Sequence, residues 1–199
     1  MCSSDLIDAT FTATGGSFDY KTIAGYTGVG VSGKTTGEID IGESIVGVFT
    51  GAVYVPYISL AFLFDGPEFG EVQEKASISV VLKSGETVAY TLTALFQADY
   101  EWTGASKIVE NMSLPTRTKA GVWEIEDPFD GMEVTQITFT ALRGECGRGV
   151  CDNQSDFAFE SLGIQQLAEI PEPGTMALLL SGVAMLGAVA RRRMASTGR

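Results

Sequence analysis

Residues 77–93, SISVVLKSGETVAYTLT, contain two alternating segments on either side of a Ser-Gly pair. Ser77–Lys83 and Glu86–Thr93 each place an apolar residue at every second position, which is the period of a β-strand with one buried face. Ser84 and Gly85 between them predict a two-residue turn. The apolar residues share one face of the hairpin, opposite its threonines: Ile78, Val80, Leu82, Val88, Tyr90 and Leu92 against Thr87, Thr91 and Thr93. The stretch therefore predicts an antiparallel β-hairpin.

Strand-like segments of the same kind recur on both sides of this hairpin. Gln136–Leu142 alternates again, with Ile137, Phe139 and Ala141 on its apolar face. Val53–Phe64 is apolar on both faces except at Pro56 and Ser59, so it is either one central strand or two strands bent at the proline. Further strand candidates complete the set: Ile7–Thr14, Tyr26–Ser32, Ile45–Thr50, Ser106–Met112, Val122–Glu126 and Phe157–Leu167. Together they predict an all-β domain over residues 7–167, an antiparallel β-sandwich of jelly-roll type.

The composition excludes several classes of function. The chain has no histidine, so Ser-His-Asp and Cys-His catalytic arrangements are excluded. Its 25 acidic and 13 basic residues give a formal net charge of −12, which disfavours nucleic acid as a partner. Without the basic residues of the last nine positions the rest of the chain is more acidic still. Such a surface suits a protein that must stay soluble outside the cell.

Carboxylates offer the remaining route to catalysis. Four of them cluster in the sequence: Glu124, Glu126, Asp127 and Asp130. A suitably placed pair could hydrolyse a glycosidic bond. Pro128 and Gly131, however, are typical of an ordinary turn, so the cluster alone does not assign an activity. A carboxylate-dependent hydrolase is therefore kept as the alternative to a protein without enzymatic activity.

The run Gly28–Thr35, GVGVSGKT, matches the phosphate-binding pattern G-x4-G-K-T. A functional phosphate loop follows a buried strand and precedes a helix. The residues that follow this run, Thr36–Gly42, are instead typical of a turn and a strand. We therefore interpret the match as coincidental.

The segment 146–156 contains the candidate disulfide and the candidate metal ligands. Cys146 and Cys151 form a C-x4-C pair flanked by glycines, which predicts a disulfide in an oxidising compartment, with free thiols as the alternative. The oxygens of Asp152, Asn153 and Asp156 could bind calcium, although an Asx-rich turn explains the same residues. No other cofactor is predicted, and zinc is disfavoured because histidine and a second cysteine pair are absent.

Tyr100 and Trp102 are the aromatic candidates for contact with carbohydrate. They lie two residues apart in the segment Asp99–Thr103, next to a predicted loop. Aromatic rings of this kind stack on sugars when they are exposed, but they also occur at the rim of a core. Both interpretations stay open at the level of the sequence.

The C-terminal segment differs in character from the rest of the chain. Pro171-Glu172-Pro173 interrupts regular structure and predicts an exposed spacer over residues 168–173. Seventeen uncharged residues follow, Gly174–Ala190, long enough for a helix of about 26 Å against a bilayer core of about 30 Å. Their apolar side chains would point in every direction, as in a transmembrane helix. The basic tail 191–199 begins with Arg191, Arg192 and Arg193, which predicts that it stays in the cytoplasm and that residues 1–173 lie outside.

This segment resembles the PEP-CTERM sorting tail of Gram-negative bacteria, a tail that the membrane peptidase exosortase processes. The resemblance covers residues 171–199 and implies that Pro171, Glu172 and Pro173 form the recognition motif and that Arg191–Arg193 form the membrane stop. Six residues after the arginines, Met194–Arg199, depart from the usual pattern, because family tails end closer to the basic cluster. The resemblance implies an exported protein, anchored in the inner membrane before processing, with exosortase as its partner. Ectodomains with such tails are often small β-sandwiches.

The first six residues, MCSSDL, lack the features expected of an exported protein. They contain no basic region, no apolar region and no A-x-A cleavage site. Cys2 does not fit a lipoprotein motif, because only Met1 precedes it. The end of a widely used sequencing adapter would encode these six residues, so we expect residues 1–6 to be translated adapter and the natural signal peptide to be missing.

These observations predict a non-enzymatic surface or extracellular-matrix protein, released after sorting and associated with extracellular polysaccharide. The alternative is a secreted carbohydrate-active hydrolase that uses a pair of carboxylates. The sequence does not identify the ligand of residues 7–167.

Overall fold

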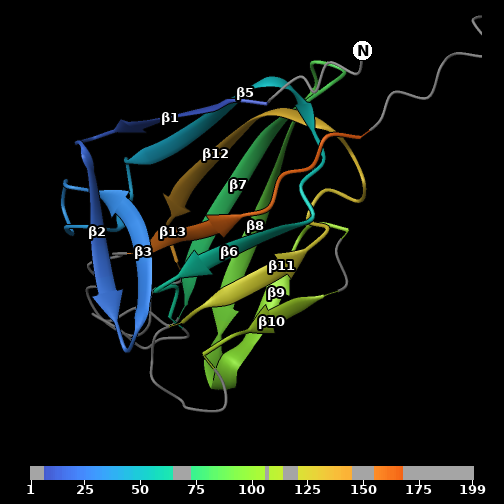
Figure 1. Cartoon of the computed structure of the whole chain (residues 1–199). Helices are drawn as coiled ribbons and strands as arrows, with labels where there is room; N and C mark the ends of the chain where they lie inside the picture. The colour runs from blue at the N-terminus through green and yellow to red at the C-terminus, as the bar shows by residue number, and fades with distance from the viewer. Residues whose placement is uncertain (1–6, 65–72, 106–107, 114–120, 145–154, 168–199) are drawn as a thin grey trace, which may run out of the picture. The chain divides into compact units, whose positions relative to one another are not determined.

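Two antiparallel β-sheets account for most of the structure, a computed structural model (Figure 1). It describes residues 7–64, 73–105, 108–113, 121–144 and 155–167. The chain separates into two compact units, residues 1–166 and 167–199, and the described residues belong almost entirely to the first. Five predicted features lie outside the described residues: the first six residues, the spacer 168–173, the helix 174–190, the basic tail 191–199 and the cysteine pair.

Sheet A contains six strands in the spatial order β1–β5–β12–β7–β8–β9. Their bounds are β1 Ala9–Thr14, β5 Ser44–Val53, β12 Val134–Leu142, β7 Glu74–Leu82, β8 Thr87–Leu95 and β9 Asp99–Trp102. Sheet B follows the order β10–β11–β6–β13–β3–β2, and a short strand β4 also pairs with β13. Their bounds are β10 Val109–Asn111, β11 Trp123–Glu126, β6 Tyr57–Ala61, β13 Asp156–Leu162, β3 Tyr26–Val31, β2 Phe18–Ile23 and β4 Ile39–Asp40.

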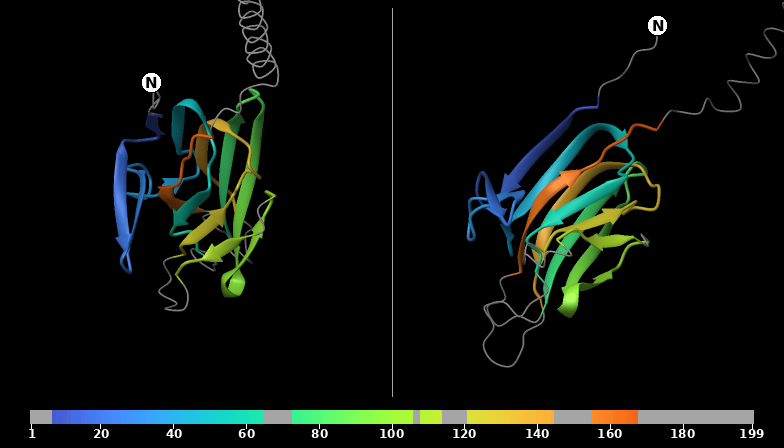
Figure 2. Two further views of the ribbon diagram at one scale, coloured as in Figure 1. Left: turned by 45° about the vertical axis from the view of Figure 1, so that its right-hand side comes forward. Right: turned by 60° about the horizontal axis from the view of Figure 1, so that its bottom comes forward.

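The strand pairs are nested in the sequence. β7 pairs with β8, β6 with β11, β5 with β12, and β3 with β13, all antiparallel. Successive pairs of this series alternate between the two sheets. The chain thus folds back on itself around the β7–β8 hairpin, and the doubled chain wraps into two layers, which Figures 1 and 2 show from three directions.

One apolar core lies between the two sheets. Ile78, Val80 and Leu92 of the predicted hairpin are almost fully buried in it, as the alternation in the sequence predicts. Aromatic side chains join the layers directly: the Phe139 ring of β12 lies 5.0 Å from the Phe159 ring of β13, centroid to centroid. The predicted all-β fold with two antiparallel sheets is therefore confirmed.

The turn of the hairpin is one residue longer than predicted. The Leu82 amide donates to the Glu86 carbonyl, so Lys83, Ser84 and Gly85 form a three-residue loop. Gly85 has φ +88°, the left-handed conformation that closes such a loop. The sequence identifies the glycine correctly, but it does not show which residue makes the last ladder bond.

Val53–Phe64 is neither a single strand nor two strands of one sheet. β5 extends as far as Val53, and β6 begins after Pro56 in the other sheet. Proline has no amide to donate to a ladder, so the chain leaves sheet A there and crosses to sheet B. Of the two interpretations of this segment, the break at the proline is correct.

The only helix among the described residues is a single 3-10 turn, η1 Phe96–Ala98. Within the described part of the chain, which ends at residue 167, no helix has the length and apolar character needed to cross a membrane.

Candidate functional site

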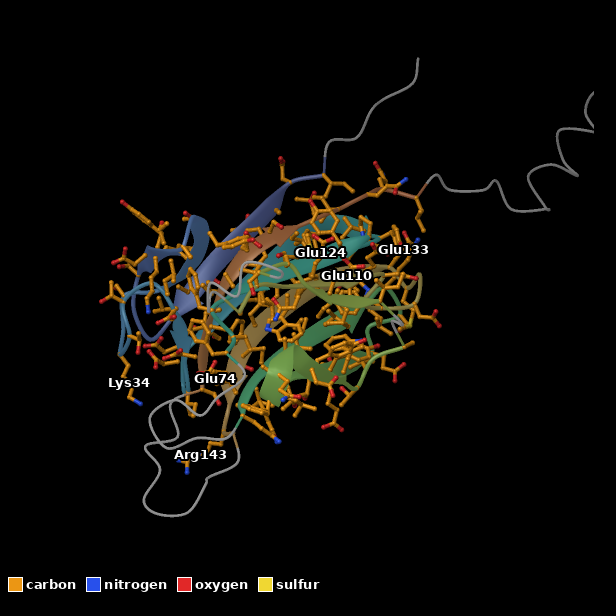
Figure 3. All side chains as sticks on the ribbon, turned by 90° about the horizontal axis from the view of Figure 1, so that it is seen from below. Lys34, Glu74, Glu110, Glu124, Glu133 and Arg143 are labelled. Carbon is orange, nitrogen blue, oxygen red and sulfur yellow. The ribbon has the colours of Figure 1, made fainter. Side chains whose placement is uncertain are left out.

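Carboxylates from three strands gather on the outer face of sheet B, the face turned away from the core. On β11, Trp123 and Ile125 point into the core. The alternate residues Glu124 and Glu126 therefore point outward. Glu110 of β10 is the direct cross-strand partner of Glu124. Figure 3 shows these two glutamates beside each other. We call Glu110, Glu124, Glu126 and Glu160 together the glutamate face.

Ser59 of β6 connects this group to β13. It is the cross-strand partner of Glu124 on its other side, and its side chain is 2% exposed. Its hydroxyl donates a hydrogen bond to the Glu160 carboxylate. An irregularity in the β13–β6 register between Phe159 and Ser161 accompanies this placement of Glu160.

The pKa of Glu124 is raised above its ordinary value. Desolvation by burial is the largest cause, and repulsion from Glu126, Glu110 and Glu160 adds to it. A carboxyl group that holds its proton more tightly than usual can act as a general acid. The glutamate face therefore has one property of a carboxylate catalytic site.

The structure separates the four carboxylates that the sequence groups together. Glu124 and Glu126 lie on the glutamate face, whereas Asp127 and Asp130 lie in the turn that follows β11. The Asp127 carboxylate accepts from the Gly131 amide at 2.8 Å, which closes that turn. Both aspartates have positive φ, as expected for residues in a tight turn. Asp127 also raises the pKa of Tyr54, after the larger effect of desolvation.

Sequence reasoning missed Glu110 and Glu160. Glu110 lies on the preceding strand and Glu160 on a distant one, and only the pairing of β10, β11, β6 and β13 brings them to the same face as Glu124. No local pattern in the sequence encodes that pairing.

Asp156, one of the three candidate calcium ligands, belongs to a second group of buried acidic residues. It is the cross-strand partner of Asp40, and the Thr35 hydroxyl lies 3.2 Å from Asp40 Oδ1 and 3.4 Å from Asp156 Oδ2. Asp152 and Asn153 lie outside the described residues. Within the described ranges, no group of three or more His, Cys, Asp or Glu side chains is placed to hold a metal ion. The calcium site stays a prediction.

The same region explains why the phosphate-loop match is not a phosphate site. The Lys34 amide donates to Glu43 Oε1 at 3.0 Å, and the Thr35 amide donates to Asp40 Oδ2 at 2.5 Å. These are the backbone donors that would face a phosphate in a working loop. The carboxylate of Glu43 also fills the space where a side chain at Gly33 would stand. The protein's own carboxylates thus satisfy the donors of the loop.

Tyr100 and Trp102 do not form an exposed platform for sugars. Both side chains are half-buried and pack against the core. The Trp102 ring stacks on Tyr90 at 5.6 Å, and the Tyr100 ring meets Trp123 edge-on at 6.1 Å. Of the two interpretations left open by the sequence, the core rim is the one that the structure supports.

The C-terminal segment provides the match to a known family. Residues 169–193 match the PEP-CTERM protein-sorting motif. The chain carries a PEP-CTERM sorting tail. This tail implies an exported protein that is anchored in a membrane before processing and is then processed by exosortase. The match includes Pro171–Pro173 and Arg191–Arg193, so the predicted resemblance is confirmed. No curated protein and no solved structure matches the chain.

Proposed function

We propose that the chain is a non-enzymatic surface or extracellular-matrix protein whose folded domain associates with extracellular polysaccharide. The PEP-CTERM match at residues 169–193 is the observation that carries this proposal, because it assigns the chain to the exported substrates of exosortase. The acidic composition agrees with a protein that remains soluble outside the cell.

In this proposal Gly174–Ala190 spans the inner membrane until exosortase acts. Arg191–Arg193 hold the C-terminus in the cytoplasm, and residues 7–167 lie outside. Cys146 and Cys151 then meet an oxidising compartment, where we propose that they form a disulfide. The support for this topology is the uncharged length of the segment and the three arginines that follow it.

We further propose that residues 7–167 form a jelly roll. The nested pairing of β7–β8, β6–β11, β5–β12 and β3–β13 supports this, because a hairpin that is wrapped into two sheets gives a jelly roll. β1, β2, β9 and β10 add further strands at the sheet edges.

Replacement of Pro171-Glu172-Pro173 by three alanines tests the sorting assignment. In a host with exosortase we expect the variant to accumulate as a larger, unprocessed form in the inner membrane fraction. The matched control is Ser196→Ala with Thr197→Ala, two changes outside the matched segment that should leave processing unchanged. Normal processing of the triple-alanine variant would contradict the assignment.

A carbohydrate-active hydrolase is the second candidate, and the raised pKa of Glu124 on the glutamate face favours it. A panel of soluble and insoluble polysaccharides, assayed for reducing ends, tests this function. Turnover that is lost in Glu124→Gln but kept in Asp130→Asn would support the hydrolase. Binding without turnover would exclude it and favour the non-enzymatic protein.

A further inference from the structure

Hydroxyl groups are common on the outer face of sheet A, although Ser77 among them is largely buried between its neighbours. On β7 the core residues alternate with Ser77 and Ser79, which therefore point outward. The same alternation turns the hydroxyls of the neighbouring strands to this side. We call this surface the hydroxyl face: Thr10, Thr12, Thr14, Ser44, Ser77, Ser79, Thr87, Thr91, Thr138 and Thr140.

The register of the sheet arranges these residues in rows. Thr138 of β12 lies opposite Val46 on one side and Ser79 on the other. Thr12 of β1 extends the row beyond Val46, and Ala89 of β8 extends it beyond Ser79. Neighbouring positions within a row are about 4.8 Å apart, and neighbouring rows are about 6.8 Å apart. The face is thus a regular array across five strands.

Charge distinguishes the hydroxyl face from the rest of the protein. The hydroxyl face has three such rows: the row through Thr138, the row of Thr10, Val48, Gln136, Val81 and Thr87, and the row of Thr14, Ser44, Thr140, Ser77 and Thr91. None of the side chains in these three rows is ionisable. The chain as a whole has a formal net charge of −12, and the outer face of sheet B carries four glutamates. The next row of the same face contains Lys75, Thr93 and Glu101, so the uncharged surface is the area of the three rows.

The chemistry of the face selects among classes of partner. Protein interfaces depend on aromatic and arginine anchors, and the three rows contain neither. Nucleic acid needs basic side chains, which the rows also lack. Serine and threonine hydroxyls both donate and accept hydrogen bonds, as sugar hydroxyls do. Threonine is also stiff at χ1, so little side-chain entropy is lost when it is held by a ligand.

We infer that the hydroxyl face binds a neutral polysaccharide chain. This inference rests on the proposed association with extracellular polysaccharide. Each hydroxyl contact is weak, because its hydrogen bond replaces one to water. A repeating polymer makes many such contacts at once, and their combined effect gives useful affinity without a deep pocket. Uncharged sugar units match this face, whereas acidic units would be repelled by the net charge of the domain.

The test uses the full-length chain in co-sedimentation with insoluble cellulose and curdlan, and in gel retardation with soluble polygalacturonate as the acidic polymer. The first variant combines Thr10→Val, Thr12→Val and Thr138→Val, which remove hydroxyls but keep shape and strand propensity. The second, Ser79→Glu, places a carboxylate in the middle row. The control combines Thr22→Val and Thr27→Val on sheet B, whose hydroxyls bond to each other at 2.8 Å. Circular dichroism and the unfolding midpoint verify that each variant is folded.

We expect the wild type and the control to bind a neutral glucan, and the two face variants to lose about tenfold or more in apparent affinity. Unchanged binding by folded face variants, or a preference for polygalacturonate, overturns the assignment of this face but leaves the association with polysaccharide intact. If the wild type binds none of the polymers and is also absent from the polysaccharide fraction of its own host, the proposed function fails as well.

Discussion

The outer faces of the two sheets differ although their inner faces are alike. Both inner faces present buried aliphatic and aromatic residues to one core, such as Ile78 from sheet A and Leu60 from sheet B. Outward, sheet A presents mostly uncharged hydroxyls, with Lys75, Asp99 and Glu101 towards its β9 edge, whereas sheet B presents Glu110, Glu124, Glu126 and Glu160. The period of a β-strand fixes which residues face the core, but it leaves the alternate positions free. In this domain those positions carry the chemical difference between the layers.

The largest expected effect on stability comes from truncating a side chain on β12 that faces the core, compared with its neighbour that faces outward. Phe139→Ala removes a buried ring that lies 5.0 Å from Phe159, and it should lower the free energy of unfolding by about 3–5 kcal/mol. Thr138→Ala, one residue away on the outer face, should cost less than about 1 kcal/mol. Urea unfolding measures both. Equal costs would show that the two faces of sheet A are not distinguished by burial.

The next largest effect on stability is expected at the turn between β7 and β8, two strands of the hydroxyl face. Gly85 has φ +88° with no atom near the position of a Cβ, so Gly85→Ala adds backbone strain alone. We expect a loss of about 1–2 kcal/mol in thermal or urea unfolding. Gly51→Ala in β5 is the control, because that position is equally open but lacks a positive φ. It should be neutral or slightly stabilising, and a loss equal to that at Gly85 would argue against strain.

The glutamate face should make stability depend on pH in a defined direction. Folding raises the pKa of Glu124, so the folded protein binds this proton more readily than the unfolded chain does. The carboxylate therefore lowers stability at neutral pH, and this penalty disappears as the pH falls below the unfolded value of about 4.3. Glu124→Gln should raise the free energy of unfolding at neutral pH by less than about 1 kcal/mol, with no gain in acid.

Glu133→Gln is the control for that experiment. Glu133 lies 2.9 Å from the Lys83 ammonium, so its removal should cause a small loss at neutral pH and not a gain. A gain of the same size in both variants would indicate a general effect of net charge instead of local repulsion on sheet B.

The smallest expected effect is a change in one pKa. Repulsion from Glu126 contributes more to the raised pKa of Glu124 than repulsion from Glu110, and Glu160 contributes least. Carboxyl NMR titration should therefore find that Glu126→Gln lowers the pKa of Glu124 more than Glu160→Gln does. Thr138→Val, on the other sheet, should not change it. The reverse order for the two glutamates would mean that Glu160 lies closer to Glu124 in solution.

The central part of the fold is predictable from local sequence. β7, β8 and β12 each alternate over a long segment, and Gly85 marks the tight turn. β2 and β9 escaped prediction, whereas β1 and β10, which are also edge strands, were predicted. β2 has its aromatic residues Phe18 and Tyr20 exposed, and β9 has only four residues, so neither shows the pattern of a half-buried strand. β4 has two residues, too few for any period to appear.

The candidate site was predictable only in part. The proximity of Glu124 and Glu126 is local, since they are two positions apart on one strand. Glu110 joins them through the register between two consecutive strands, and Glu160 through pairing between strands that are distant in the chain. Register between such strands depends on the whole buried pattern and on turn geometry, which a local segment does not contain. The sorting tail, in contrast, is a linear signal and was read directly.

The nested strand pairs also determine when this domain can fold. Partners become more distant along the chain with each pair outward from β7–β8, and contacts between distant segments form slowly. β13 lies in the middle of sheet B, between β6 and β3, yet it is the last strand before the sorting tail. Until residue 162 is available, β6 and β3 lack the strand that joins them, and sheet B has two open edges in addition to those at β10 and β2. An exported chain therefore cannot complete sheet B until the segment next to its sorting tail is present.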